Sequence, residues 1–112
     1  MSLPNLNRLL SLEAPTQVAD GAGGLSETWA VLGSLWAEVK PRTGRDRERE
    51  AVGTARVEYR ITVRALPVGQ SLRPEPGQRF REGVRLFRIV AVADQGSEGR
   101  FLTCFAREEV AA

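Results

Sequence analysis

Few residues in this 112-residue sequence could carry acid–base, nucleophilic or metal chemistry. Histidine is absent, which removes the commonest general base and the usual zinc ligand. Asp46, Glu48 and Glu50 form a cluster of carboxylates, but the arginines between them neutralise it, so we interpret the segment as a solvated ion-pair surface. The sequence therefore predicts no catalytic residue, no metal site and no cofactor, and favours a binding or structural protein over an enzyme.

Cys104 is the single cysteine, which excludes an internal disulfide and a thiolate metal cluster. It lies between Thr103 and Phe105 in an apolar run, so we expect a small buried core residue rather than a nucleophile. Glu108 and Glu109 fall in the charged C-terminal segment, where no cavity is expected to shift a pKa. A carboxylate-dependent enzyme, the third functional alternative, would need such a cavity.

The composition is that of a soluble globular protein, with 42% apolar and 27% charged residues. Residues 1–112 are expected to form one domain, because a chain of this length supports a single core. No apolar run approaches the roughly 20 residues that span a bilayer, so no membrane contact is expected. The N-terminal residues have no basic leader, so we expect no signal peptide and a cytoplasmic protein.

The basic residues are almost all arginines, whose planar guanidinium groups bind phosphates and carboxylates in a bidentate manner. One group comprises Arg42, Arg45, Arg47 and Arg49, and a second comprises Arg56, Arg60 and Arg64. Acidic residues alternate with both groups, whereas a nucleic-acid reader clusters its cations and adds exposed aromatic rings. Charged interfaces between protein subunits are therefore favoured, and a small basic nucleic-acid-binding module is the alternative.

A strand over residues 56–65 is the centre of the predicted fold. Its sequence, RVEYRITVRA, alternates charged and apolar residues, which on a strand gives one charged and one apolar face. We expect a half-buried antiparallel strand whose outward face carries arginines and Glu58. A second strand is predicted over residues 28–39, with a bulge at Gly33-Ser34. Trp36 lies on its more polar face, where it either packs under a loop or anchors a partner subunit.

Three loops separate the predicted strands. The glycine-rich loop 14–27 begins at Ala14-Pro15, and its tip is a candidate partner contact made of Asp20, Gly21, Gly23 and Gly24. Residues 41–55 are a charged insert in which ion pairs at i,i+3 spacing favour a short helix. Residues 66–77 are a proline-rich loop.

The remaining segments complete an all-β pattern. Residues 6–13 are a helical turn or a first strand, residues 78–82, 84–93 and 100–106 are strands, and a frayed tail begins at Arg107. About five or six strands, with one short helix between the second and third main strands, predict a small antiparallel barrel or sandwich.

The order of these features is similar to that of the bacteriophage head–tail joining family, the head-closure or stopper proteins of long-tailed phages. The resemblance covers nearly the whole chain, through NLNRLLSLEAP, Asp20-Gly21 with Gly23-Gly24, ETW, LWAEVKPRTGRDRE, VEYRITVRA, GVRLFRIVAVAD and FLTCFAREE. Gene transfer agents, which are phage-like particles, use a similar protein. A neighbouring tail-completion protein would look almost the same from sequence.

The resemblance implies a small SH3-like β-barrel that assembles into a homo-oligomeric ring, of six copies in the particle, although the isolated chain can be monomeric. Such rings lie between portal or adaptor proteins and tail-terminator or tail-tube proteins, where they retain packaged double-stranded DNA. The expected location is the bacterial cytoplasm during assembly and then the head–tail junction of the particle.

Candidate contact residues follow from this role. Arg42, Arg45, Arg47 and Arg49 are candidates for the DNA channel or for contacts between subunits, because phosphate contact needs no base recognition. The candidate ring-interface face consists of Arg56, Glu58, Arg60, Arg64 and Trp36.

Overall fold

The computed structural model describes residues 3–42, 57–95 and 99–109, and these residues form six strands. The strands are β1 (Arg8–Ala19), β2 (Leu25–Pro41), β3 (Glu58–Arg64), β4 (Arg79–Glu82), β5 (Arg85–Gln95) and β6 (Phe101–Glu109). No helix occurs within the described ranges. The helix predicted within residues 41–55 falls almost entirely on residues 43–55, which lie outside them.

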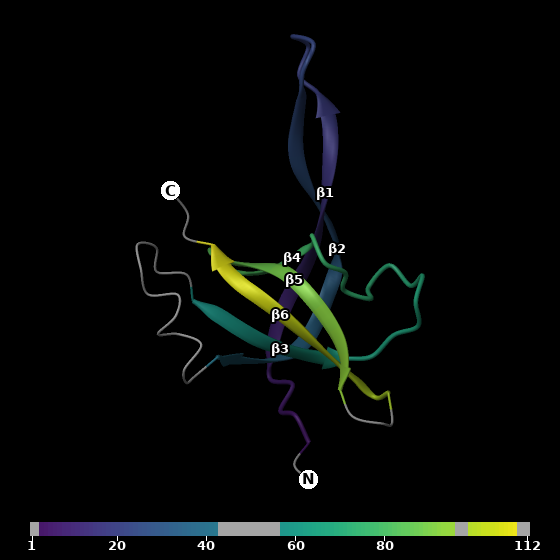
Figure 1. Cartoon of the computed structure of the whole chain (residues 1–112), viewed down its shortest axis with the longest axis vertical. Coiled ribbons are helices and arrows are strands. Elements are labelled where there is room, and N and C mark those ends of the chain that lie inside the picture. Colours follow the sequence, from purple (N-terminus) through teal and green to yellow (C-terminus); the bar gives the residue numbers. More distant parts are fainter. Residues whose placement is uncertain (1–2, 43–56, 96–98, 110–112) are drawn as a thin grey trace.

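The strands form one sheet that closes on itself in the order β1-β2-β3-β6-β5-β4 (Figure 1). Every neighbouring pair is antiparallel, so the prediction of an all-β antiparallel fold is confirmed, and the closure of the sheet favours the predicted barrel over the sandwich. Closure depends on β1 and β4, which pair over only three residues, from Ser11 opposite Arg81 to Glu13 opposite Arg79. A closed sheet leaves no free edge along the barrel itself.

The core fills the inside of this closed sheet with alternate residues of each strand. In β3, Ile61 and Val63 are fully buried while Arg60 and Arg64 are exposed, as the period-two pattern predicts, although Thr62 between the two core residues is also buried. The other residues of the buried hydrophobic cluster are Leu10, Leu12, Ala37, Phe80, Phe87, Ile89, Leu102, Cys104 and Ala106. Tyr59 packs edge-on against Phe87, with ring centroids 5.1 Å apart.

A bulge in β2 marks the place where the β1–β2 hairpin leaves the barrel. Leu12 lies opposite Gly33 but Glu13 lies opposite Val31, so Leu32 is an extra residue in β2, one position before the predicted bulge at Gly33-Ser34. The absence of a side chain at Gly33 also lets Leu72 approach closely, because a Cβ at this position would lie 2.6 Å from Leu72 Cδ2. The loop before β4 therefore packs directly on the bulge.

Beyond the bulge, β1 and β2 continue as a two-stranded hairpin that projects from the barrel (Figure 1). We call residues 14–31 the arm. This corrects the prediction of a loop over residues 14–27, since only residues 20–24 form the turn. Pro15 does not end the strand, because β1 pairs with β4 only as far as Glu13 and a proline is tolerated on an edge that needs no donor.

The C-terminal segment corrects a second prediction. Residues 107–109 were expected to begin a frayed tail, but they extend β6, with Arg107 opposite Glu58 and Glu108 opposite Phe87. Charge alone suggested a solvated tail. The structure shows that these charges instead have partners on neighbouring strands, because Arg107 pairs with Glu58 and Glu108 with Arg85.

Cys104 is a buried core residue, as predicted. Burial raises the pKa of its thiol from 9.0 to about 12, which cuts the thiolate fraction at neutral pH by about a thousandfold. We therefore expect a maleimide to modify Cys104 far more slowly in the folded protein than in urea, with mass spectrometry as the measurement. Equal rates in both conditions would show that the core opens readily.

Candidate functional site

The tip of the arm brings together the four residues predicted as a partner-contact loop. The carboxylate of Asp20 accepts hydrogen bonds from the backbone N–H groups of Ala22 and Gly24, at 2.8 and 3.0 Å. These two bonds lower the pKa of Asp20 and keep it charged. Gly21 and Gly23 have φ values of 82° and 85°, which the tight turn requires and which glycine adopts without strain. The tip is thus an ordered, negatively charged turn.

The base of the arm contains a buried carboxylate that sequence reasoning missed. Glu13 is only 4% exposed, and its two oxygens accept hydrogen bonds from Arg79 Nε at 2.6 Å and Arg81 Nε at 2.9 Å. Burial pushes the pKa of Glu13 up, but the two guanidinium groups outweigh burial and hold it below its ordinary value. Since 66 residues separate Glu13 from Arg79, only knowledge of the β1–β4 pairing could have revealed the contact.

Trp29 extends this cluster along the arm. The guanidinium group of Arg79 lies 4.0 Å from the centroid of the Trp29 ring, and that of Arg88 lies 5.0 Å from it. Both distances permit cation–π attraction. Glu13, Arg79 and Trp29 therefore connect β1, β4 and β2 at one point, which fixes the direction in which the arm leaves the barrel.

A second network of charges ties the strand ends around Arg85. Arg85 donates to Glu108 through Nε at 2.8 Å and through Nη2 at 3.1 Å, and to the hydroxyl of Tyr59 at 3.1 Å. Next to it, Arg8 of β1 forms an ion pair with Glu82 of β4. Hydrogen bonds from Arg85 and Arg8 lower the pKa of Glu108 and Glu82 respectively. This shift at Glu108 is contrary to the sequence-based expectation.

These lowered pKa values predict that acid destabilises the protein. The unfolded chain, with ordinary carboxylates, takes up protons at a higher pH than the folded chain in which Glu13, Glu82 and Glu108 are paired. The stability from these pairs is thus complete above a pH of about 5 and is lost as the pH falls through the folded values. Urea unfolding at pH 7 and at pH 3.5 measures the loss. In Arg85→Met the loss should be smaller, because the largest cause of the lowered pKa of Glu108 is then removed.

The outward face of β3 carries part of the predicted ring-interface face. Arg60 and Arg64 are exposed, and each guanidinium group lies 6.0 Å from the centroid of a phenylalanine ring, Phe105 and Phe101 respectively. Glu58 is instead engaged within the chain, with Arg42 at 3.3 Å and Arg107 at 3.5 Å. This face therefore offers exposed arginines supported by aromatic rings, whereas Glu58 is already occupied.

Trp36 lies on the outer side of the neighbouring strand β2, one residue beyond the pair of Ala37 with Val63. The expectation that it packs under a loop is wrong, since the residue is 56% exposed. Its cross-strand neighbour Leu9 is also exposed, so the two residues form a small apolar patch over β1 and β2. Its role as an anchor for a partner subunit stays a prediction.

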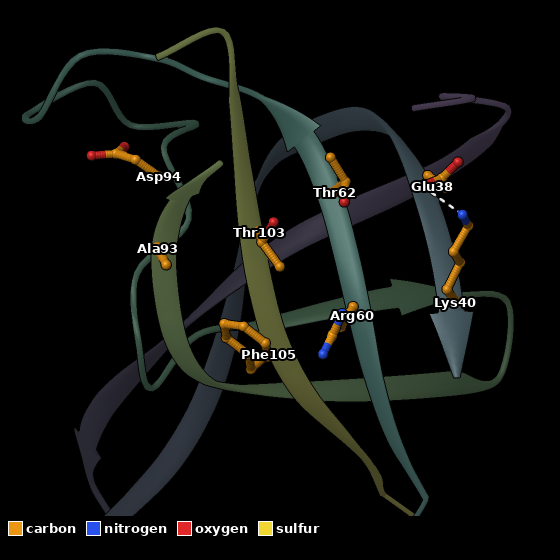
Figure 2. A pocket seen from close by; sticks show the side chains of 8 residues that line it. All are labelled: Glu38, Lys40, Arg60, Thr62, Ala93, Asp94, Thr103 and Phe105. Carbon is orange, nitrogen blue, oxygen red and sulfur yellow. Dashed lines mark ion pairs between the residues drawn. The ribbon is translucent and has the colours of Figure 1, made fainter. Parts of the chain in front are cut away.

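An open groove of about 530 Å³ runs over the outer faces of β2, β3, β6 and β5 (Figure 2). Lys40 and Glu38 form one wall of it, 3.7 Å apart, and Asp94 stands on the opposite wall. Arg60 and Phe105 lie between these walls. The groove thus combines charged side chains with an aromatic floor, a composition suited to a peptide segment rather than to a small-molecule reaction.

Of the predicted arginine group, only Arg42 falls on the described residues, where it pairs with Glu58. Arg45, Arg47, Arg49 and Arg56 lie outside them. No group of three or more metal-binding side chains occurs within residues 3–42, 57–95 and 99–109. In the same ranges, no helix is long and apolar enough to cross a membrane.

Comparison with solved structures finds the same fold in a phage-like particle. A chain from the virion of a native gene transfer agent particle is 55% identical, with a TM-score of 0.80, and the match covers 98% of this chain and all of that one. A protein from Shigella flexneri 2a, solved in solution, is 20% identical with a TM-score of 0.68 and 96% of each chain covered, and it supports the fold alone.

No curated protein matches the sequence. The phage head completion protein family matches residues 1–109, which include all six strands, the arm and the groove. This is a family of structural phage head proteins. Over essentially its whole length, the chain belongs to the phage head completion protein family.

Proposed function

We propose that this protein is a structural connector at the head–tail junction of a tailed phage or gene transfer particle. The observation that carries the proposal is the 55% identity, over 98% of the chain, to a component of a native gene transfer agent virion. In this role, copies of the chain assemble into a ring below the portal and adaptor proteins, retain the packaged DNA and offer a docking surface to the tail. The chain is made in the bacterial cytoplasm and is then incorporated at the junction.

Two features of the surface support an assembly role. The arm projects from a closed barrel that is already a complete folding unit, so its exposed residues serve no purpose in the core. The groove and the outward arginines Arg60 and Arg64 lie on a separate part of the barrel. A chain with two different contact surfaces can form head-to-tail contacts, which close into a ring when the rotation between copies permits. An SH3-type barrel, the fold class that the resemblance implies, fits this arrangement.

Deletion of the gene in the host that produces the particles tests the proposal. We expect electron microscopy to show filled or leaking heads beside separate finished tails, because the connector between them is missing. Expression of the intact chain from a second locus should restore joined particles and serves as the control. Fully joined, infectious or transducing particles without the gene would contradict a connector role.

A further inference from the structure

The arm has the properties of a segment that inserts into another molecule. Residues 14–31 include Asp20 and Glu27 and no lysine or arginine, so the arm has a formal charge of −2 in a chain of net charge +2. Leu25 and Val31 are 69% and 64% exposed, and Val18 is also exposed. A two-stranded hairpin alone is only marginally stable in water. Packing of these apolar side chains against a second surface would stabilise the arm by removing their exposed area from water.

That surface must belong to another molecule. The arm points away from the barrel (Figure 1), and β1 and β2 in the arm pair only with each other. Its direction is fixed at the base by the contacts of Glu13 and Trp29 with Arg79. The arm therefore cannot fold back onto the outer face of its own barrel without breaking this cluster.

The groove and the adjoining part of β3 are complementary in charge to the arm. Three cations lie there, Lys40, Arg60 and Arg64, against two carboxylates, Glu38 and Asp94. The carboxylate of Glu38 already accepts a hydrogen bond from Asn5 N at 2.8 Å and lies near Lys40.

The two arginines remain available to an incoming anion. Neither Arg60 nor Arg64 has an ion-pair partner among residues 3–42, 57–95 and 99–109, and each guanidinium group lies 6.0 Å from the centroid of a phenylalanine ring. An acidic, partly apolar ribbon is the partner that such a surface fits.

We propose that the arm of one copy of this chain docks in the groove of the next copy, with Glu27 facing Arg60 and the apolar side chains of the arm lying over Phe105. The proposal rests on the proposed connector function and names the contact that holds its ring together. Each copy supplies one arm and one groove, so the contact is head-to-tail and repeats around the ring. The occupant is a second copy, rather than DNA, because the arm offers exposed apolar side chains to the aromatic floor of the groove as well as carboxylates to its cations, whereas the phosphate backbone of DNA offers no apolar side chain.

Crosslinking within assembled particles tests the contact. Particles are produced with the full chain carrying Ser26→Cys in the arm and Ala93→Cys in the groove, two small and exposed positions. A flexible bismaleimide should then convert the chain into a ladder of covalent multimers on a denaturing gel, whose largest band reports the size of the ring. The buried thiol of Cys104 is not expected to react. The matched control pairs Ser26→Cys with Val84→Cys, which is exposed at the β4–β5 turn, and should give no ladder.

Charge reversal provides a second, independent test in the same particles. Glu27→Arg and Arg60→Glu should each lower the yield of joined particles at least about tenfold, since like charges then meet in the interface. The double variant should recover most of the yield, because the pair is restored with opposite polarity. Both positions are exposed, so circular dichroism should show unchanged folding.

The outcomes separate the two proposals. Joined particles without a crosslinked ladder, or two defective single variants without recovery in the double variant, would overturn the arm–groove contact while leaving the connector role intact. If Arg60→Glu particles lose DNA and Glu27→Arg does not restore it, Arg60 contacts DNA and not the arm. Normal particles after gene deletion would instead contradict the connector function itself.

Discussion

Replacement of Glu13 by alanine is expected to lower the free energy of unfolding by about 3–5 kcal/mol. Glu13 is 4% exposed and neutralises Arg79 and Arg81, so its removal leaves one partly buried guanidinium group, that of Arg79, without a carboxylate. In a domain of this size such a loss corresponds to a fall in melting temperature of more than about 10 °C. Thermal and urea unfolding followed by circular dichroism measure it.

Two variants show whether the cause is the lost charge pair. Glu109→Ala, an exposed carboxylate at the end of β6, should change stability by less than about 0.5 kcal/mol. The triple replacement of Glu13, Arg79 and Arg81 by leucine, methionine and methionine should recover much of the stability, because apolar residues of similar volume often replace a buried ion pair without loss. A triple variant as unstable as Glu13→Ala would mean that the cluster is needed for packing geometry rather than for charge balance.

Shortening of the arm is expected to abolish assembly while leaving the barrel folded. Residues 16–28 are replaced by Asn-Gly, a two-residue turn that joins Pro15 to Trp29 and preserves the cluster at the base. The yield of joined particles should fall at least about a hundredfold, since the deletion removes Val18 and Leu25, two exposed aliphatic side chains that the proposed contact would bury. The melting temperature should change by only a few degrees, because the arm lies outside the core.

The matched control removes exposed apolar side chains elsewhere. Val68→Ser and Val84→Ser, at two valines that are 85% and 88% exposed in loops away from the arm, should leave the yield of joined particles unchanged. A normal yield with the shortened arm would show that the arm takes no part in assembly. A shortened chain that fails to fold would show that the arm contributes to the core, contrary to the burial pattern.

The sequence predicted the barrel well because its strands have strong local signals. The alternation in β3, the glycine at the bulge and the prolines of the 66–77 loop are all readable from short stretches of chain. The arm was missed because its glycines and Pro15 resemble loop residues, and nothing local shows that β1 and β2 continue to pair beyond the barrel. Strand pairing is decided by contacts between distant segments, which a single sequence does not display.

The candidate contact residues were likewise predicted only where a local sequence pattern identifies them. Asp20 and its neighbouring glycines form the tip of the arm, and Arg60 and Arg64 face outward, as local pattern predicts. Glu13 was not recognised, because a single acidic residue in an apolar strand does not indicate an ion pair until its partners on β4 are known. The groove was not recognised either, since it combines side chains from four strands that meet only in the folded sheet.

The short pairing of β1 with β4, which closes the barrel, also affects the folding kinetics. These strands are more than 60 residues apart along the chain and pair over only three residues. The chain therefore loses the conformational entropy of closing a long loop before any contact between the two strands can stabilise it. We expect the strand pairs that are adjacent in sequence, β4–β5 and β5–β6, to form first and the β1–β4 pairing to form last. Replacement of Glu13 by alanine should then accelerate unfolding and leave the folding rate almost unchanged, since the β1–β4 pairing is not yet formed in the transition state.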